Sequence, residues 1–160
     1  MAIDLFPVRL TPGQDLRQGL EAAVAAQGCS AAYVVSGIGS LSDAQLRLAG
    51  AAQPVRLPGD TELLTLAGSV SADGAHLHAT LADAQGAVIG GHVPYGCAVR
   101  TTAEVLLALI REWRFARQFD ARTGYDELAI SPVDLADAAA AVRVRSDGED
   151  GLRDDGDEDD

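Results

Sequence analysis

The sequence predicts a single α+β domain with a mostly antiparallel, barrel-like sheet and one main helix. The chain has 160 residues, which suffices for one ordinary domain with its own core. Hydrophobic residues make up 48% of the chain and aromatic residues only 4%, so we expect an aliphatic core. Many short hydrophobic segments separated by turn sequences, against one clear helical segment, favour an antiparallel sheet.

The main helix is expected near the amino terminus, after a first strand over residues 4–10. Apolar residues recur with helical spacing over residues 15–27, and Gly28 follows where a left-handed residue would end the helix. A buried strand is then expected over residues 31–36, and the Gly-x-Gly of residues 37–39 predicts a bend.

Hairpins are expected in the middle of the chain. Short strands around residues 45–48 and 54–57 precede a series of stronger strands joined by turn sequences such as Ser-Ala-Asp-Gly and Asp-Ala-Gln-Gly. The stronger strands are predicted over residues 62–70, 75–82 and 87–93.

The later segments are less uniform in their patterns. Residues 98–110 fit either a long strand or a helix, because residues 104–110 have high helix propensity whereas Thr101 and Thr102 favour a strand. A late strand is expected around residues 113–116, followed by a turn at 123–125. We place the domain at residues 1–130, a short extension at 131–145, helical over 134–142, and a tail at 146–160.

The tail is strongly acidic. It holds nine acidic residues and Arg153 as its one basic residue, so it carries −8 of the net charge of −12 and leaves −4 for the rest. A segment of this composition is expected to be disordered. Direct nucleic-acid binding is not expected, because such binding depends on positive charge that neutralises phosphates.

Location and some chemistry also follow from composition. The chain has no basic, apolar leader and no apolar run long enough for a membrane span. Cys29 and Cys97 are too few for a disulfide framework, and each is interpreted as a small buried hydrophobe. We therefore expect a cytoplasmic protein. The absence of lysine from the whole chain excludes a lysine Schiff base and a lysine nucleophile.

All three histidines fall within two neighbouring predicted strands. His76 and His78 project from the same face of one strand, because side chains alternate along a strand. A three-residue loop over residues 84–86 would pair position 78 with His92, which brings Cβ atoms to within about 5 Å. Three converging imidazoles predict a site for zinc or another divalent transition metal with one coordination position open. The alternative is a solvated strand face that binds nothing.

Other side chains could complete such a site. Glu62, at the start of a predicted strand, is the candidate general acid or base, and its alternative is an ordinary solvated or ion-paired carboxylate. Glycines 90 and 91 either give backbone clearance beside the metal or mark a bulge. An anion-binding group, or else solvated or ion-paired side chains, could come from four arginines: Arg100, Arg111, Arg114 and Arg117.

Six sequence segments in a fixed order resemble one family from about residue 4 to residue 128. The segments are Leu-Thr-Pro-Gly-Gln-Asp-Leu at 10–16, Ser-Gly-Ile-Gly-Ser-Leu-Ser at 36–42, Glu-Leu-Leu-Thr-Leu-Ala-Gly at 62–68, His-Leu-His at 76–78, Gly-Ala-Val-Ile-Gly-Gly-His at 86–92 and Thr-Gly-Tyr-Asp-Glu-Leu at 123–128. They resemble the bacterial plants-and-prokaryotes-conserved (PPC) domain, also called domain of unknown function 296. The resemblance implies a mixed α/β fold similar to that of acetolactate decarboxylase, a homotrimer, and a metal held by His76, His78 and His92.

The chain departs from plant members of that family. It has no Arg-Gly-Arg-Pro segment, and it has Asp60 and Thr61 where the plant members carry Arg-Phe before the glutamate that matches Glu62.

The histidine cluster leads to the first functional hypothesis, which is a metal-dependent hydrolase or lyase acting on a small molecule. The alternatives are a trimeric protein-interaction module and a DNA-associated regulatory module, both without catalysis. The metal motif of cupins is excluded because His92 follows His78 too soon.

Overall fold

The computed structural model describes residues 4–133. The helix expected over 134–142, most of the extension and the acidic tail over 146–160 lie outside the described residues. Within them the chain forms one helix and nine strands, which are β1 (Asp4–Leu10), α1 (Leu16–Ala26), β2 (Ala31–Leu46), β3 (Val55–Leu57), β4 (Thr61–Ser71), β5 (Gly74–Ala82), β6 (Val88–His92), β7 (Ala98–Leu109), β8 (Trp113–Asp120) and β9 (Tyr125–Pro132).

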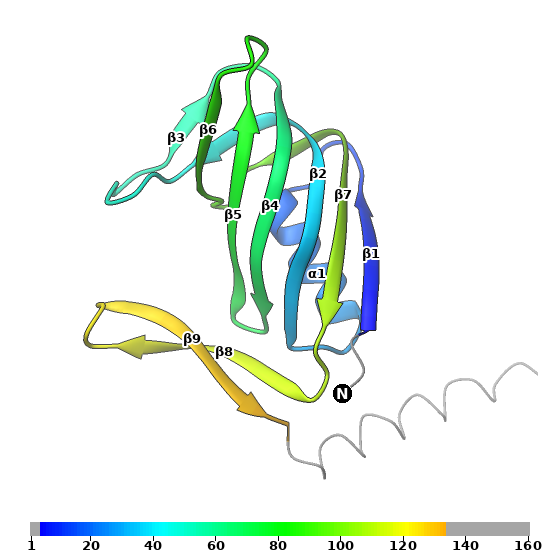
Figure 1. Ribbon diagram of the computed structural model, residues 1–160, viewed down its shortest axis with the longest axis vertical. Helices are drawn as coiled ribbons and strands as arrows, with labels where there is room; N and C mark the ends of the chain where they lie inside the picture. The colour runs from blue at the N-terminus through cyan, green and yellow to red at the C-terminus, as the bar shows by residue number, and fades with distance from the viewer. Residues whose placement is uncertain (1–3, 134–160) are drawn as a thin grey trace, which may run out of the picture.

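Seven of these strands form one antiparallel sheet (Figure 1). The strand order is β1-β7-β2-β4-β5-β6, and β3 pairs with β2 outside this path. The sheet does not close, since β1 and β6 lie at opposite ends of the path. One isolated bridge, between Arg47 and His92, joins the chain just after β2 to the end of β6. The predicted single domain, with a mostly antiparallel sheet and one main helix, is confirmed.

The ambiguous segment over residues 98–110 is a strand. β7 pairs along its length with β1 and β2, and Val105, Leu107 and Leu109 are buried while their neighbours alternate with them. Two flanking strands satisfy the backbone of β7 on both sides, so the tertiary context overrides the helix propensity of its second half.

β2 joins two segments that were expected to be separate strands. The Gly-x-Gly does not interrupt the pairing; instead the strand continues with register shifts where it meets β7. Gly39, in the predicted bend, has a φ of +159° and its Cα hydrogens face the β7 backbone at Thr102 and Ala103, where a Cβ would overlap with main-chain atoms. Glycine therefore allows two strands to approach closely here.

Helix α1 covers one face of the sheet. Asp15 caps it by accepting a hydrogen bond from the Gln18 amide at 2.8 Å, as expected for an N-cap carboxylate. The second oxygen of Asp15 accepts from the Gly96 and Cys97 amides at 2.5 and 3.1 Å, which ties the start of α1 to the segment before β7. The buried side of the helix consists of Leu16, Leu20 and Val24.

The two faces of the sheet differ in what covers them. The face toward α1 buries aliphatic side chains such as Val70, Leu77 and Leu109. The opposite face, which we call the outer face, carries the residues that alternate with them. In register, Tyr33 pairs with Ser69 and Ser69 with His76, so these residues share the outer face.

Strands β8 and β9 form a separate hairpin that projects from one end of the sheet (Figure 1). Phe115 of β8 is buried and contacts the Tyr33 ring edge to face, with centroids 5.3 Å apart. The Arg117 amide donates to Asp73 in the β4–β5 turn at 2.9 Å. The hairpin is therefore docked beside the amino-terminal end of β5, and β9 runs past residue 130.

No helix within residues 4–133 combines the length and apolarity that a membrane crossing requires.

Candidate metal centre

The register between β5 and β6 places the histidines as the loop length predicts. His78 pairs directly with His92. The loop is closed by a hydrogen bond from the Asp83 amide to the Ala87 carbonyl at 3.0 Å. The Asp83 side chain accepts from the amides of Gln85 and Ala87, both at 2.9 Å. A turn of this kind fixes the pairing of the strands that it joins, so the predicted three-residue loop is confirmed.

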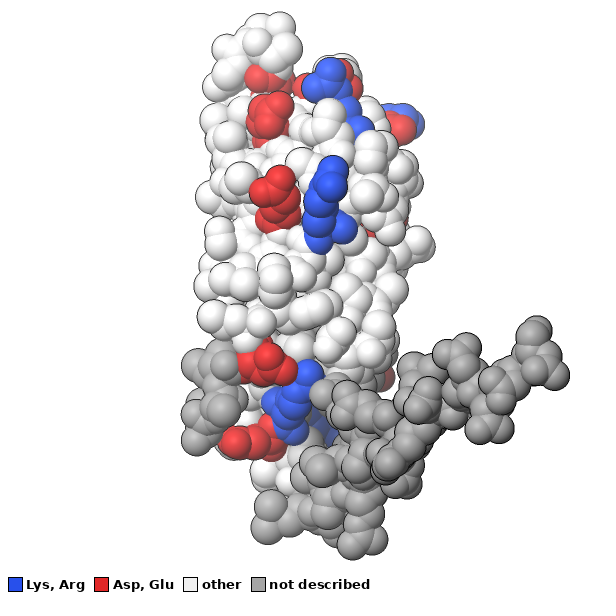
Figure 2. All heavy atoms as spheres, turned by 90° about the vertical axis from the view of Figure 1, so that its right-hand side faces the viewer, with Lys and Arg blue, Asp and Glu red and all other residues white. Residues whose placement is uncertain are grey.

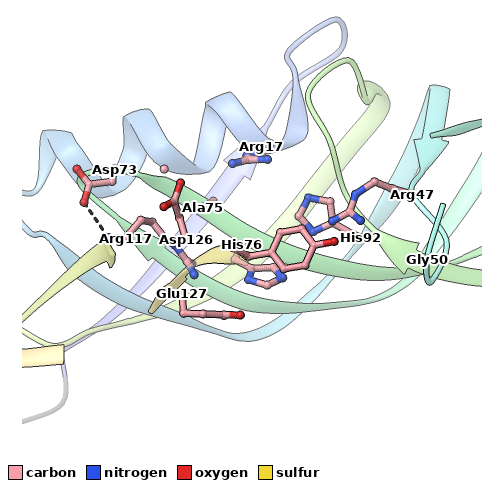
Figure 3. A pocket seen from close by; sticks show the side chains of 12 residues that line it. Arg17, Arg47, Gly50, Asp73, Ala75, His76, His92, Arg117, Asp126 and Glu127 are labelled. Carbon is pink, nitrogen blue, oxygen red and sulfur yellow. Dashed lines mark hydrogen bonds between the residues drawn. The ribbon is translucent and has the colours of Figure 1, made fainter. Parts of the chain in front are cut away.

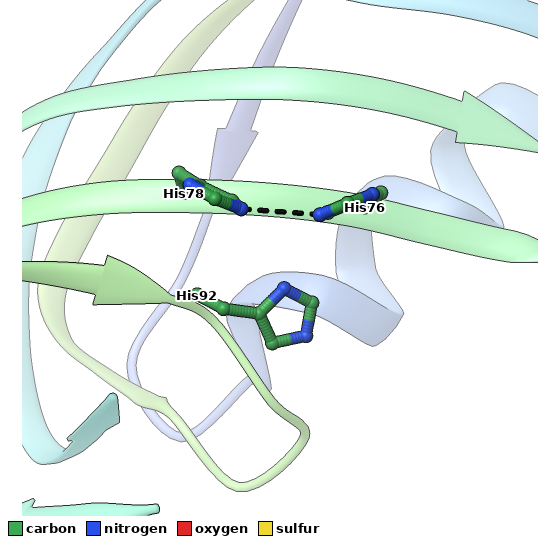
Figure 4. Close-up of side chains that lie close together, drawn as sticks. All are labelled: His76, His78 and His92. Atoms are coloured by element: carbon green, nitrogen blue, oxygen red, sulfur yellow. Dashed lines mark hydrogen bonds between the residues drawn. The ribbon is translucent and has the colours of Figure 1, made fainter. Parts of the chain in front are cut away.

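The three imidazoles converge (Figure 4). One ligand nitrogen from each of His76, His78 and His92 lies within 4.8 Å of the others, and the Nε2 atoms of His76 and His78 are 3.1 Å apart. Ring centroids are 5.1 to 5.7 Å apart. Nitrogens that each lie about 2.0–2.1 Å from one zinc ion in tetrahedral geometry are about 3.4 Å apart, which is close to the separation of the His76 and His78 nitrogens. The geometry can therefore hold a metal ion through three ligands.

Backbone packing holds His92 in place. The His92 amide donates to the Arg47 carbonyl at 3.0 Å, and the Arg47 amide donates to the His92 carbonyl at 2.9 Å. A Cβ at Gly91 would lie 3.0 Å from the Arg47 carbonyl oxygen, whereas Gly90 has only ordinary contacts. The clearance expected from the two glycines is therefore required at Gly91, where β6 meets the end of β2.

His92 has an unusual electrostatic environment. Its Nδ1 is buried and has no hydrogen-bond partner within the described part of the chain. Burial first, then the nearby His76 and Arg47, lower the pKa of His92 from 6.5 to about 4. The pKa of His76 is also lowered, by burial first and then by Arg117. Both rings are therefore favoured in the neutral form, which is the form that binds metals.

Two cavities border the histidine cluster. One, of about 480 Å³, is lined by His76 and His92 together with three arginines and three acidic residues (Figure 3). The charged lining residues are Arg17, Arg47, Arg117, Asp73, Asp126 and Glu127. The other, of about 460 Å³, includes all three histidines and the backbone of Gly90 and Gly91. A metal bound by the cluster would thus face space on the protein surface.

The structure separates Glu62 from this cluster. Glu62 is exposed at the start of β4 and pairs with Ala82, at the far end of β5 from His76, and it lines neither of the two cavities. Its catalytic role stays a prediction. Glu127 of β9 instead lies in the larger cavity, and its charge acts on His76.

The four arginines proposed as anion-binding groups lie at different places in the structure. Arg117 lines the larger cavity. Arg100 pairs with Asp60 at 2.8 Å, Arg111 pairs with Asp4 at 2.9 Å, and Arg114 is exposed on β8.

Of the six charged residues of the cavity, sequence reasoning singled out only Arg117 and missed the other five, which are Arg17, Arg47, Asp73, Asp126 and Glu127. A signal existed for Glu127, which belongs to the Thr-Gly-Tyr-Asp-Glu-Leu segment of the family resemblance. Arg17 and Arg47 gave none, because they are single basic residues in an amphipathic helix and after a strand.

Residues 2–111 match the Plants and Prokaryotes Conserved (PCC) domain, also abbreviated PPC. The chain belongs to this family. Among curated proteins, the bifunctional protein GlmU of Synechococcus sp. (strain JA-3-3Ab) is 47% identical over 147 residues, which is 92% of this chain and 23% of that protein. The chain thus spans less than a quarter of that relative.

Solved structures show the same PPC fold. A hypothetical protein from Salmonella enterica is 38% identical with a TM-score of 0.78, and the match covers 82% of this chain and 95% of that one. A protein from Archaeoglobus fulgidus, described as metal-containing, is 28% identical with a TM-score of 0.70, over 79% of this chain and 93% of that one.

Proposed function

We propose that this PPC-domain protein binds a divalent transition metal, zinc by preference, through His76, His78 and His92, and that the metal serves a small-molecule site. The observation that carries the proposal is the convergence of three imidazole nitrogens within 4.8 Å of one another. Imidazole ligands without a carboxylate suit zinc and similar ions. The buried, unpartnered Nδ1 of His92 adds support, since such an atom costs free energy unless something binds it. The metal-containing relative from Archaeoglobus supports the same assignment.

Three protein ligands leave one position for a water molecule or a substrate, which fits a hydrolase or lyase. A zinc ion held there would act as a Lewis acid and would lower the pKa of a bound water to about 7. The chain itself supplies proton-handling groups near this position. Glu127 lies in the cavity beside His76 and is placed to hold a proton on its carboxylate, whereas Glu62 lies farther along the sheet.

Metal analysis of protein purified without added ions tests the assignment. We expect about one divalent ion per chain in the wild type and a large loss in His78→Ala. Thr80→Ala is a matched control, because Thr80 follows His78 on the same face of β5 and should leave the metal content unchanged. Equal metal content in wild type and His78→Ala would contradict the proposal.

A second candidate is a homotrimeric, cytoplasmic interaction module in which the metal is structural. Exposed apolar residues favour self-association, since Ile38 and Leu64 are 54% and 43% exposed on strands β2 and β4. The view from the β1 side also shows a broad area without charged side chains (Figure 2). A substrate screen on the metal-loaded protein separates the two candidates: turnover that His78→Ala abolishes favours the enzyme, and its absence favours the module.

A further inference from the structure

Arginines gather at the larger cavity although the protein is acidic. Residues 4–133 contain nine arginines against thirteen acidic residues. Three of the nine, Arg17, Arg47 and Arg117, nevertheless line the cavity that borders His76 and His92. They come from α1, from the chain after β2 and from β8, so the fold brings together residues that are far apart in sequence.

Most other arginines of the described chain are bound to carboxylates. Ion pairs outside the cavity join Arg56 to Asp43, Arg100 to Asp60, Arg111 to Asp4 and Arg122 to Asp120. Ion pairs of this kind are a common fate of surface arginines and carry no functional signal.

The three cavity arginines are partnered to different degrees. Arg17 pairs with Glu21 at 3.1 Å and stacks over the Tyr95 ring at 4.2 Å. Arg117 donates from its guanidinium to the neutral Ser69 hydroxyl at 3.1 Å. The Arg47 side chain makes no hydrogen bond or ion pair with any residue among 4–133, although Figure 3 shows it beside His92. Both Arg47 and Arg117 thus line the cavity, and neither guanidinium pairs with a carboxylate of residues 4–133.

Three acidic residues also line the cavity, so its positive and negative side chains are equal in number. Asp73 is bonded to the Arg117 backbone amide, and Asp126 and Glu127 belong to the β9 side of the cavity. Arg47 lies beside His92 (Figure 3), so its positive charge is on the histidine side of the cavity. A divalent metal bound by the histidines would add to the positive charge there.

We propose that the cavity binds a small oxyanion, with Arg47 and Arg117 holding its anionic group next to the metal position. This inference rests on the proposed metal-dependent small-molecule site and specifies its ligand class as a molecule with a carboxylate or a phosphate. Arginine suits this role because its planar guanidinium donates two parallel hydrogen bonds to such groups. The cavity volume of about 480 Å³ is in the range of small-molecule sites.

Calorimetric titration of the full chain with two probes, succinate and inorganic phosphate, tests the proposal. We expect saturable binding of one probe to the zinc-loaded wild type, weakened at least about tenfold in Arg47→Gln and in Arg117→Gln. Tighter binding of succinate would identify a carboxylate ligand, and tighter binding of phosphate a phosphorylated one. Arg47→Lys, which keeps the charge, should restore part of the affinity.

The control is Arg122→Gln, because Arg122 pairs with Asp120 in the β8–β9 turn and lines neither cavity. It should bind the probe as the wild type does. Melting temperatures of all variants exclude unfolding as the cause of a loss. Binding of neither probe, or equal affinity in wild type, Arg47→Gln and Arg117→Gln, would overturn the proposal.

Metal content, measured on every sample, separates this inference from the proposed function. Arg47→Gln that retains its metal but loses the probe supports both. If the wild type binds no metal, the proposed function fails, and the probes are titrated into the metal-free chain. Binding that Arg47→Gln and Arg117→Gln weaken would then support the anion site alone. Absence of binding would reject the anion site as well.

Discussion

His92 combines three constraints on one side chain. Its backbone bonds in both directions with Arg47, its ring meets His76 and His78, and its Nδ1 is buried without a partner in the described chain. Holding an uncharged imidazole without a hydrogen-bond partner beside two other imidazoles therefore lowers the free energy of unfolding. The proposed metal ion would supply a partner for this imidazole.

The metal-free protein should lose stability as the pH falls from about 6.5 to about 4. In this window the unfolded chain takes up a proton on His92, whose ordinary pKa is 6.5, whereas the folded chain, with a pKa of about 4, does not. The unfolded state binds more protons, so the free energy of unfolding decreases with falling pH. Urea unfolding of chelator-treated protein across this range measures the effect.

His92→Gln is the control for this pH dependence. It should flatten the curve in part, since the lowered pKa of His76 acts in the same direction. A wild-type stability that stays constant between pH 6.5 and 4 would contradict the electrostatic description of the cluster.

The two cysteines should differ in reactivity. Cys97 is fully buried, its thiol donates to the Gln45 carbonyl at 3.3 Å, and burial raises its pKa. Cys29 is half-buried. Because the thiolate is the reactive form, iodoacetamide should modify Cys29 in the folded protein and Cys97 only after unfolding, as followed by mass spectrometry. Equal rates at both positions in the folded chain would show that the Cys97 site is open.

At the scale of single elements, β5 links the core to the site. Its odd-numbered residues Ala75, Leu77, Ala79 and Leu81 are buried, whereas His76 and His78 are exposed. Alternation along one strand therefore serves both purposes. The neighbouring strand β4 approaches closely at Gly68, whose φ is +140° and where a Cβ would overlap with the His76 carbonyl group.

Gly68→Ala should destabilise the protein by about 2–4 kcal/mol, because the added methyl group cannot fit without separating β4 from β5. The shift would move His76, so metal affinity should fall as well. Denaturant unfolding and metal analysis measure the two effects.

Gly86→Ala provides the comparison, since Gly86 has a φ of +79° in the β5–β6 loop and nothing lies within 4 Å of its Cβ position. It should cost only about 1 kcal/mol, from backbone strain. Similar losses in both variants would mean that close strand approach does not matter at Gly68.

At the scale of the whole molecule, α1 covers one face of the sheet, whereas the β8–β9 hairpin covers the other face only at one end. Helix α1 packs against the inner face, while the outer face carries the histidines and exposed residues such as Leu5, Tyr33 and Ile38. Large apolar side chains exposed on one face are typical of association surfaces. Self-association through the outer face, as in the proposed homotrimer, would place the candidate metal site near a subunit boundary.

Light scattering coupled to size-exclusion chromatography should give three times the chain mass for the wild type. Ile38→Asp should reduce the mass, because a charge buried between subunits costs several kcal/mol. Gln18→Asp adds the same charge to an exposed position of α1, on the opposite side of the sheet, and should leave the mass unchanged. A monomeric wild type would reject self-association through the outer face.

The local features of this protein follow from short stretches of its sequence. The two-residue period of β5 and the turn sequence after it set which histidines share a face and which pair across strands. Both depend only on neighbouring backbone geometry, which a short stretch of sequence specifies. The segment order that resembles the PPC domain likewise identified the family before any fold was known.

The features that join distant segments depend on how the elements pack in three dimensions. β7 is a strand because β1 and β2 flank it, which no local propensity records. Arg17, Arg47, Arg117 and Glu127 meet in one cavity because the helix, the Arg47–His92 bridge and the β8–β9 hairpin dock at one end of β5. Contacts of this kind depend on how whole elements pack. For the same reason Glu62 lies apart from the histidines, although it is near them in sequence order.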